Sequence, residues 1–192
     1  MPERDPEEIP TDDPRPGGLR RARSLVLVNT GPGKGKTSAA MGVVLRALAR
    51  EWRVAVVQFL KSGRWHTGEE KMCRQLGVDW WAEGEGFTWD SEDLDLDRAV
   101  AAGAWAHARS LIVAGDHRLV VLDEITYPMN WGWIDTEEVV DTIRERPAHV
   151  SVVATGRNAP AALIDVADTV AEIGDVKHAY RAGIRAMRGI DY

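Results

Sequence analysis

Short apolar runs rich in valine, leucine and alanine recur along the chain, and longer segments separate them. Such runs, bounded by polar or glycine-containing turns, are typical of strands that are buried on both faces of a sheet. We predict strands at 24–29, 53–59, 78–81, 119–122, 150–154 and 168–173.

The segments between these runs predict helices. Residues 97–114 place apolar side chains on one face, as an amphipathic helix does, whereas 37–49 are apolar almost all round and predict a buried helix. Residues 67–76 and 135–145 predict two more. Strands that alternate with helices need crossover connections, so we predict an α/β fold with a mostly parallel sheet and ligands at the carboxyl ends of its strands.

The first 20 residues have a different composition from the rest. They hold five of the nine prolines among acidic residues and a Gly17-Gly18 pair, and they offer little to bury. We therefore predict a mobile tail at 1–20 and one domain at 21–192. The alternative is a segment that orders over a bound ligand, with Arg20, Arg21 and Arg23 facing an anionic surface.

Composition narrows the range of partners and locations. The formal net charge of −6 argues against nucleic acid or an anionic membrane as the main partner, since either favours a basic face. The single cysteine, Cys73, allows no internal disulfide. The chain has no apolar run of about 18 residues and no apolar N-terminal stretch. We expect a cytoplasmic protein without a membrane span.

A phosphate-binding loop follows the first predicted strand. The segment Thr30-Gly-Pro-Gly-Lys-Gly-Lys-Thr37 matches G-x-x-x-x-G-K-[ST] except that Thr30 replaces the first glycine. Positive φ angles at Gly31, Gly33 and Gly35 would let the loop point its N–H groups inward. Lys36 would supply charge, and the Thr37 hydroxyl would reach a metal ion. This predicts a three-layer, P-loop NTPase-like (RecA-like) domain; the alternative is a glycine-rich turn with an incidental lysine. The predicted ATP-binding residues here are Gly31, Gly33, Lys34, Gly35, Lys36, Thr37 and Ser38.

Two acids follow the strand at 119–122. Asp123 and Glu124 lie where the Walker B acids of such domains hold Mg²⁺ or Mn²⁺, and either of them can be the ligand beside Thr37. The second acid can join the metal or act as a base. The alternative is that Asp123 only caps the next element.

Two further segments contain residues that could contact a ligand. Phe87 and Trp89 stand two apart in a glycine-rich loop, so that they face the same way in an extended chain, although core packing would also explain them. Arg157 follows the strand at 150–154 and would lie at the ligand edge, unless it is an ordinary surface charge.

From about Leu25 to Tyr192 the sequence resembles the P-loop type of ATP:corrinoid adenosyltransferases of cobalamin synthesis. The matching stretches are Gly31-Pro-Gly-Lys-Gly-Lys-Thr37, Gln58-Phe59, Gly86-Phe-Thr-Trp89, Val121-Leu-Asp-Glu-Ile-Thr-Tyr127, Thr155-Gly-Arg157, Ala167-Asp-Thr-Val170, Lys177-His-Ala-Tyr180 and Gly189-Ile-Asp-Tyr192. The Thr30 substitution is itself similar to the loop of that family.

The resemblance implies a homodimer that uses ATP, a divalent metal and a reduced corrinoid such as cobyrinic acid a,c-diamide or a cobalamin. Co(I) would attack the 5′ carbon of ATP, and triphosphate would leave. Lys36 and Glu124 would serve the triphosphate and its metal, and Arg157 would help to bind ATP. Phe87 and Trp89 would displace the lower axial ligand of the corrinoid, and an external flavoprotein would reduce the cobalt.

Two other activities fit the phosphate loop alone. One is an ATPase or switch protein that hydrolyses ATP at the γ-phosphate, with Glu124 as the base. The other is a kinase for a small molecule. The released product separates the three activities: triphosphate, phosphate with ADP, or ADP with a phosphorylated acceptor.

Overall fold

The computed structural model describes residues 17–60, 67–82 and 94–191. In these ranges a six-stranded sheet has the order β3-β2-β4-β5-β1-β6, and each of its pairings is parallel. The strands are β1 (Val26–Thr30), β2 (Val54–Gln58), β3 (Asp79–Ala82), β4 (Leu119–Asp123), β5 (Ser151–Thr155) and β6 (Thr169–Glu172). The parallel α/β sheet predicted from the sequence is thus confirmed.

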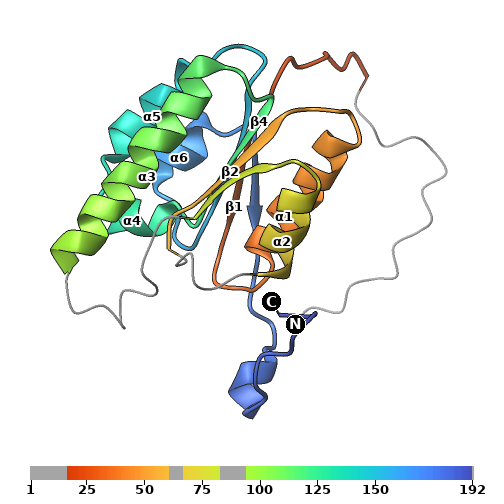
Figure 1. Ribbon diagram of the computed structural model, residues 1–192, viewed down its shortest axis with the longest axis vertical. Coiled ribbons are helices and arrows are strands. Elements are labelled where there is room, and N and C mark those ends of the chain that lie inside the picture. The colour runs from red at the N-terminus through yellow and green to blue at the C-terminus, as the bar shows by residue number, and fades with distance from the viewer. Residues whose placement is uncertain (1–16, 61–66, 83–93, 192) are drawn as a thin grey trace.

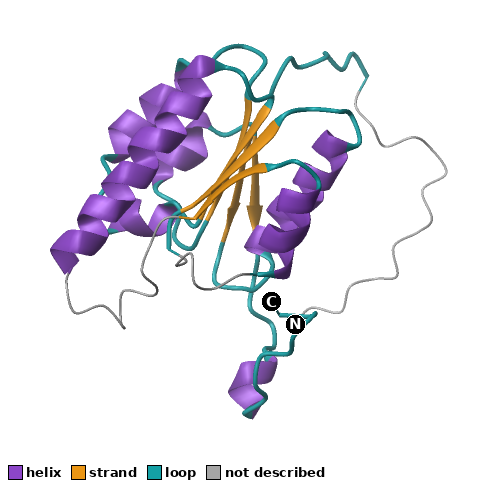
Figure 2. Cartoon of the chain, viewed as in Figure 1, coloured by secondary structure: helices purple, strands orange, loops and turns teal. Residues whose placement is uncertain are grey.

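Helices cover both faces of the sheet and make three layers (Figure 1; Figure 2). The helices are α1 (Lys36–Leu48), α2 (Gly68–Gln75), α3 (Leu94–Ala114), α4 (Thr126–Asn130), α5 (Thr136–Arg144) and α6 (Ala161–Val166), and the 3-10 helix η2 (Ala179–Ala182) lies near the C-terminus. In Figure 1, α1 and α2 lie on one side of the sheet, and α3, α5 and α6 on the other. Among the described helices, none has the length and apolar character needed to cross a membrane.

The alternation of side chains along each strand divides the core in two. On β4, Val120 and Leu122 pack in the cluster that includes α3 and α5, whereas Leu119 and Val121 pack in the cluster under α1 and α2. All four are at most 1% exposed. Burial on both faces explains why the strands are continuous apolar runs instead of alternating ones.

The structure departs from the sequence predictions in a few elements. α4, α6 and η2 were not predicted, because they span five, six and four residues and are too short to show helical periodicity. α1 is not buried all round: it covers the sheet with one face, and Leu45 on the other face is 57% exposed.

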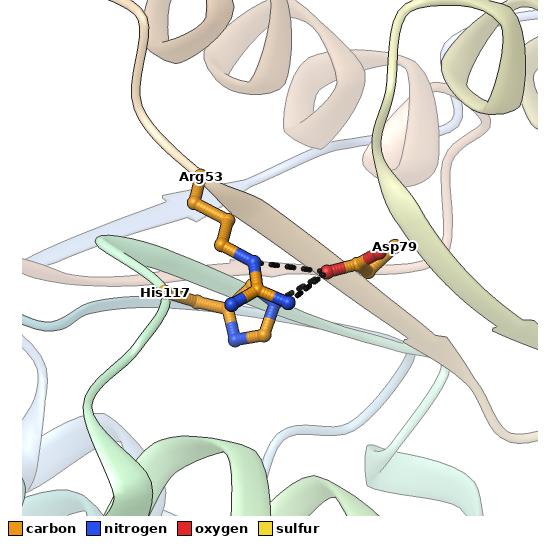
Figure 3. A network of polar contacts seen from close by, with 3 residues as sticks. All are labelled: Arg53, Asp79 and His117. Carbon is orange, nitrogen blue, oxygen red and sulfur yellow. Dashed lines mark hydrogen bonds and ion pairs between the residues drawn. The ribbon is translucent and has the colours of Figure 1, made fainter.

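A network of polar side chains lies at the amino ends of three strands, opposite the predicted ligand edge (Figure 3). The Oδ2 atom of Asp79 accepts hydrogen bonds from Arg53 Nε at 3.2 Å and Nη2 at 3.0 Å, and it lies 2.8 Å from His117 Nε2. The hydrogen bond with His117, and then the one with Arg53, lower the pKa of Asp79, while partial burial opposes them. The network therefore joins the starts of β2, β3 and β4.

The lowered pKa of Asp79 predicts an acid-dependent part of the stability. Its contribution is present above the pKa of the unfolded chain, about 3.9, and is lost as the pH falls through the lower value of the folded protein. We expect Asp79→Asn to lower the free energy of unfolding at pH 7, and the deficit to shrink toward pH 3. Urea denaturation at both pH values measures this, with Asp116→Asn, an exposed neighbour, as the control. A deficit of equal size at both pH values would contradict it.

Candidate functional site

The phosphate loop connects β1 to α1 and packs against the chain that leaves β6. Gly31 and Gly35 have φ angles of 97° and 115°, as expected for a loop of this kind. Gly33 does not share that conformation, which corrects the prediction for this residue. Its importance is proximity, because a Cβ atom there would lie 2.3 Å from the Gly174 carbonyl oxygen. The Gly33 N–H donates to Ile173 O at 2.7 Å, so the loop is fixed to this segment.

Thr30, in place of the usual first glycine, connects the loop to neighbouring segments. Its hydroxyl accepts a hydrogen bond from the Ala159 N–H at 3.1 Å, and its carbonyl accepts one from the Ile173 N–H at 2.8 Å. A glycine would keep only the second of these. The substitution therefore adds a contact between the phosphate loop and the segment after β5.

Lys36 begins α1, and its ammonium folds back over the loop. Nζ donates to the carbonyl oxygens of Gly31 at 2.9 Å and Gly33 at 2.5 Å. Burial lowers the pKa of Lys36, as does the positive charge of Arg157, and the negative charges of Glu124 and Asp123 partly offset the shift. Two cations that share one site in this way favour a polyanionic ligand.

Asp123 lies behind the loop and is fully buried. Its Oδ1 accepts hydrogen bonds from the hydroxyls of Thr37 at 2.9 Å and Thr155 at 2.8 Å, and its Oδ2 accepts one from Gln58 Nε2 at 2.8 Å. These donors come from α1, β5 and β2. The carboxylate thus orients the Thr37 hydroxyl and joins three elements at the carboxyl edge of the sheet.

Glu124 is turned toward the cavity by an unusual backbone conformation. Its φ of 65° lies in the left-handed region, which non-glycine residues rarely adopt and which often marks a functional site. Its N–H donates to Thr155 Oγ1 at 2.9 Å, and the residue lines the same cavity as Lys36 and Thr37.

Hard oxygen ligands of the kind that Mg²⁺ prefers meet at this point. Mg²⁺ takes one or two carboxylates and completes its shell with substrate phosphates and water. Thr37 and Glu124 beside an anion cavity fit that pattern, with Asp123 behind them. Within the described ranges, no group of three or more His, Cys, Asp or Glu side chains forms a metal site made by protein alone.

The loop after β5 places Arg157 at the cavity. Gly156 has a φ of 142°, and a Cβ atom on it would lie 2.0 Å from the Thr126 hydroxyl oxygen. That hydroxyl donates to Arg157 O at 2.7 Å, and Asn130 Nδ2 donates to the carbonyls of Arg157 at 3.3 Å and Asn158 at 3.0 Å. The backbone of this loop is therefore held by α4, an element that the sequence analysis missed.

A cavity of about 430 Å³, within the usual range for ligand sites, lies at the phosphate loop, although the predicted Gly31 and Asp123 do not line it. Of the predicted binding residues, it is lined by Gly33, Lys34, Gly35, Lys36, Thr37, Ser38, Glu124 and Arg157. Besides Pro32 in the loop itself, five lining residues were not predicted: Thr67, Glu69, Tyr127, His178 and Asp191. They stand in segments without a nucleotide motif, although Tyr127, His178 and Asp191 lie in stretches that carry the family resemblance.

Tyr127 is the unpredicted residue with the clearest electrostatic effect. Burial raises its pKa, and so does the negative charge of Glu124, so its hydroxyl remains a hydrogen-bond donor at neutral pH. Its ring lies 5.8 Å from that of Trp131, which lies 4.7 Å from Trp133. Tyr127 thus connects the cavity wall to a cluster of three aromatic rings.

The predicted aromatic residues Phe87 and Trp89 lie outside the described residues. Their assignment to the corrinoid therefore remains a prediction from the sequence.

Comparison with known proteins identifies the same family from a family model and from individual relatives. Residues 22–192 match the family model described as ATP:corrinoid adenosyltransferase BtuR/CobO/CobP. A corrinoid adenosyltransferase of Salmonella typhimurium is 39% identical over 180 residues, which cover 94% of this chain and 91% of that protein. One from Pseudomonas aeruginosa is 44% identical over 175 residues, covering 90% and 86%. One from Sinorhizobium is 41% identical over 174 residues, covering 88% and 81%.

Proposed function

This chain belongs to the ATP:corrinoid adenosyltransferase family, and we propose from that premise how its residues adenosylate a corrinoid with ATP. The observation that carries the proposal is a phosphate loop whose Lys36 and Thr37 share one cavity with Glu124 and Arg157. All four side chains suit a triphosphate with a divalent cation.

In the proposed reaction, the Co(I) of the reduced corrinoid attacks the 5′ carbon of ATP. A cobalt–carbon bond forms, the carbon–oxygen bond breaks, and the triphosphate leaves with the electron pair. No nucleophile or base from the protein is required. What the protein provides is orientation for in-line attack and stabilisation of charge that grows on the leaving group.

The cavity residues have separate roles in binding the triphosphate and its metal ion. Lys36 and Arg157 place two positive charges at the triphosphate, and the loop N–H groups with the α1 N-terminus add hydrogen bonds and a favourable dipole. When bound, Mg²⁺ supplies further positive charge at the phosphate oxygens. We assign Thr37 and Glu124 to hold it, and Asp123 to position Thr37 and accept from water in the metal shell.

The assignment of Glu124 to the metal predicts a defect that depends on Mg²⁺. Glu124→Gln removes a charge that faces the cavity, so we expect turnover to fall about tenfold or more, with partial recovery at high Mg²⁺ and almost unchanged stability. Glu138→Gln, on the exposed side of α5, is the matched control. Rates measured across a Mg²⁺ titration test this. If Glu124→Gln turns over as fast as the wild type at limiting Mg²⁺, Glu124 is not a metal ligand.

The released product tests the function itself. With ATP and a prereduced corrinoid, the proposed reaction yields equimolar triphosphate and adenosylated corrinoid. Release of phosphate and ADP would instead support hydrolysis at the γ-phosphate, the alternative that the phosphate loop alone allows. Phosphate analysis by anion exchange, together with the absorption change of the corrinoid, distinguishes these outcomes.

The predicted role of Trp89 calls for a second assay. If Trp89 displaces the axial ligand, Trp89→Ala should retain most of its rate with prereduced Co(I) and lose most of it with Co(II) and a mild protein reductant. Prereduction bypasses the step that the aromatic residue assists. Trp52→Ala, which removes a tryptophan stacked 4.5 Å from Arg118 at the other end of the sheet, is the control. Equal losses in both assays, with a lowered melting temperature, would assign Trp89 to packing.

We further propose the setting in which the enzyme works. The family resemblance supports a homodimer, an external flavoprotein as reductant, and Mg²⁺ or Mn²⁺ as the metal. The single cysteine, Cys73, which is buried and cannot form an internal disulfide, supports a cytoplasmic location. Size-exclusion chromatography with light scattering tests the dimer directly.

A further inference from the structure

The chain after β6 forms an arm, residues 174–191, that reaches away from the sheet in Figure 1. Its apolar side chains are largely exposed: Val176 95%, Tyr180 77%, Ile184 59%, Met187 64% and Ile190 78%. Packing against the apolar core therefore does not explain why the arm lies where it does. Polar contacts with the phosphate loop do.

Two contacts join the arm to the loop. At its root, the N–H of Gly33 donates to Ile173 O at 2.7 Å. At its far end, Lys34 forms an ion pair with Oδ1 of Asp191, while Oδ2 of Asp191 accepts a hydrogen bond from the Met187 N–H at 2.7 Å. The hydrogen bond from Met187 fixes Asp191 within its own turn, so the ion pair with Lys34 holds the whole end of the arm against the loop.

Between these contacts, the arm brings His178 to the triphosphate cavity. His178 is partly buried and lines the cavity with Lys34, Lys36 and Asp191. Its Nδ1 accepts a hydrogen bond from the Tyr180 N–H at 3.1 Å, where it caps η2. A neutral imidazole that accepts at Nδ1 carries its proton on Nε2. The arm therefore fixes the tautomer in which His178 is a donor.

We propose that His178 is a triphosphate-binding residue that donates a hydrogen bond from Nε2 to a phosphate oxygen, and that Asp191 is the residue that positions the arm through Lys34. This inference rests on the proposed function, because it concerns the leaving group of that reaction. Lys34 has three N–H donors, so it can hold Asp191 and a phosphate oxygen together, and its ammonium separates the two anions.

Direct binding measurements test the role of His178 without any corrinoid. We expect His178→Ala to raise the dissociation constants of MgATP and of inorganic triphosphate roughly tenfold or more, the usual effect of losing a hydrogen bond to a charged group. His178→Gln carries an amide donor at a similar reach and should recover much of the affinity. Adenosine binding should not change. Lys177→Ala, on the exposed side of the arm, is the control.

The outcomes are separable by isothermal titration calorimetry and circular dichroism. Unchanged triphosphate affinity in folded His178→Ala would overturn the assignment of His178. Asp191→Asn should weaken triphosphate binding and speed amide hydrogen exchange in the arm; tighter binding would instead show that Asp191 competes with phosphate for Lys34 and would overturn its positioning role. If the wild-type protein binds triphosphate but transfers no adenosyl group, the proposed function fails while this inference stands.

Discussion

Lys36→Ala should lower turnover at least a hundredfold while the protein stays folded. The ammonium lies over the loop, where it donates hydrogen bonds to the carbonyl oxygens of Gly31 and Gly33. In the proposed reaction its positive charge stabilises the negative charge that grows on the departing triphosphate. Losing such a group from the site of a developing anion typically costs about 3 kcal/mol, which corresponds to at least a hundredfold in rate. Burial and the neighbouring charge of Arg157 lower the pKa of Lys36, so an anion placed beside this ammonium would stabilise its charged form.

The measurement is adenosyl transfer at saturating ATP and prereduced corrinoid, so that reduction does not limit the rate. Lys71→Ala, an exposed lysine on α2, should behave as the wild type. Circular dichroism and thermal melting establish that Lys36→Ala is folded. Turnover within a few-fold of wild type would mean that the phosphate loop does not stabilise the leaving group, and the proposed mechanism would have to be abandoned.

Gly33→Ala should be nearly as damaging, for a reason that depends on backbone packing. The added Cβ would lie 2.3 Å from Gly174 O and 2.7 Å from Ile173 O, and these backbone atoms cannot rotate away as a side chain would. Either the loop or the chain after β6 must move, at a typical cost of about 1–3 kcal/mol in stability. A displacement of about 1 Å in a catalytic loop can also reduce the rate about a hundredfold.

Gly42→Ala, on the helix that follows the phosphate loop, provides the matched control. Gly42 lies within α1, and nothing comes within 4 Å of a Cβ atom built there. Alanine should therefore stabilise the protein by about 0.5–1 kcal/mol through its higher helix propensity, with turnover unchanged. Melting temperatures and rates of the two variants together test the account, because a Gly33→Ala protein as stable and active as Gly42→Ala would show that the close approach to Gly174 does not matter.

The sheet was predictable because its strands are buried on both faces. The strand Leu119–Asp123 has no solvent-facing side, so its first four residues are all apolar, and Asp123 and Glu124 mark where the run ends. The phosphate loop was predictable for a related reason. Its chemistry is concentrated in one continuous segment between a strand and a helix, which is the condition under which spacing alone is informative.

The rest of the site could not be found by spacing, since it depends on contacts between distant segments. Gln58 and Thr155 complete the hydrogen bonds of Asp123 from 65 and 32 residues away. Neither residue type is unusual at the end of a strand, so nothing local distinguishes them. The sequence analysis explained Gly33 by a positive φ angle, which is wrong. The residue must be glycine because the Gly174 carbonyl lies against it, and Gly174 is far along the chain.

The position of β1 in the sheet has a consequence for how the enzyme is made. β1 carries the phosphate loop and is the first strand in the chain, yet its neighbours are β5 and β6, the last two. Ribosomes extend a chain from its N-terminus at about 5–20 residues per second, so β1 leaves the ribosome well before either neighbour exists. An unfinished chain consequently holds a phosphate loop without the strands that shape it. Nucleotide can thus assist only a late stage of folding, after β5 and β6 have been translated.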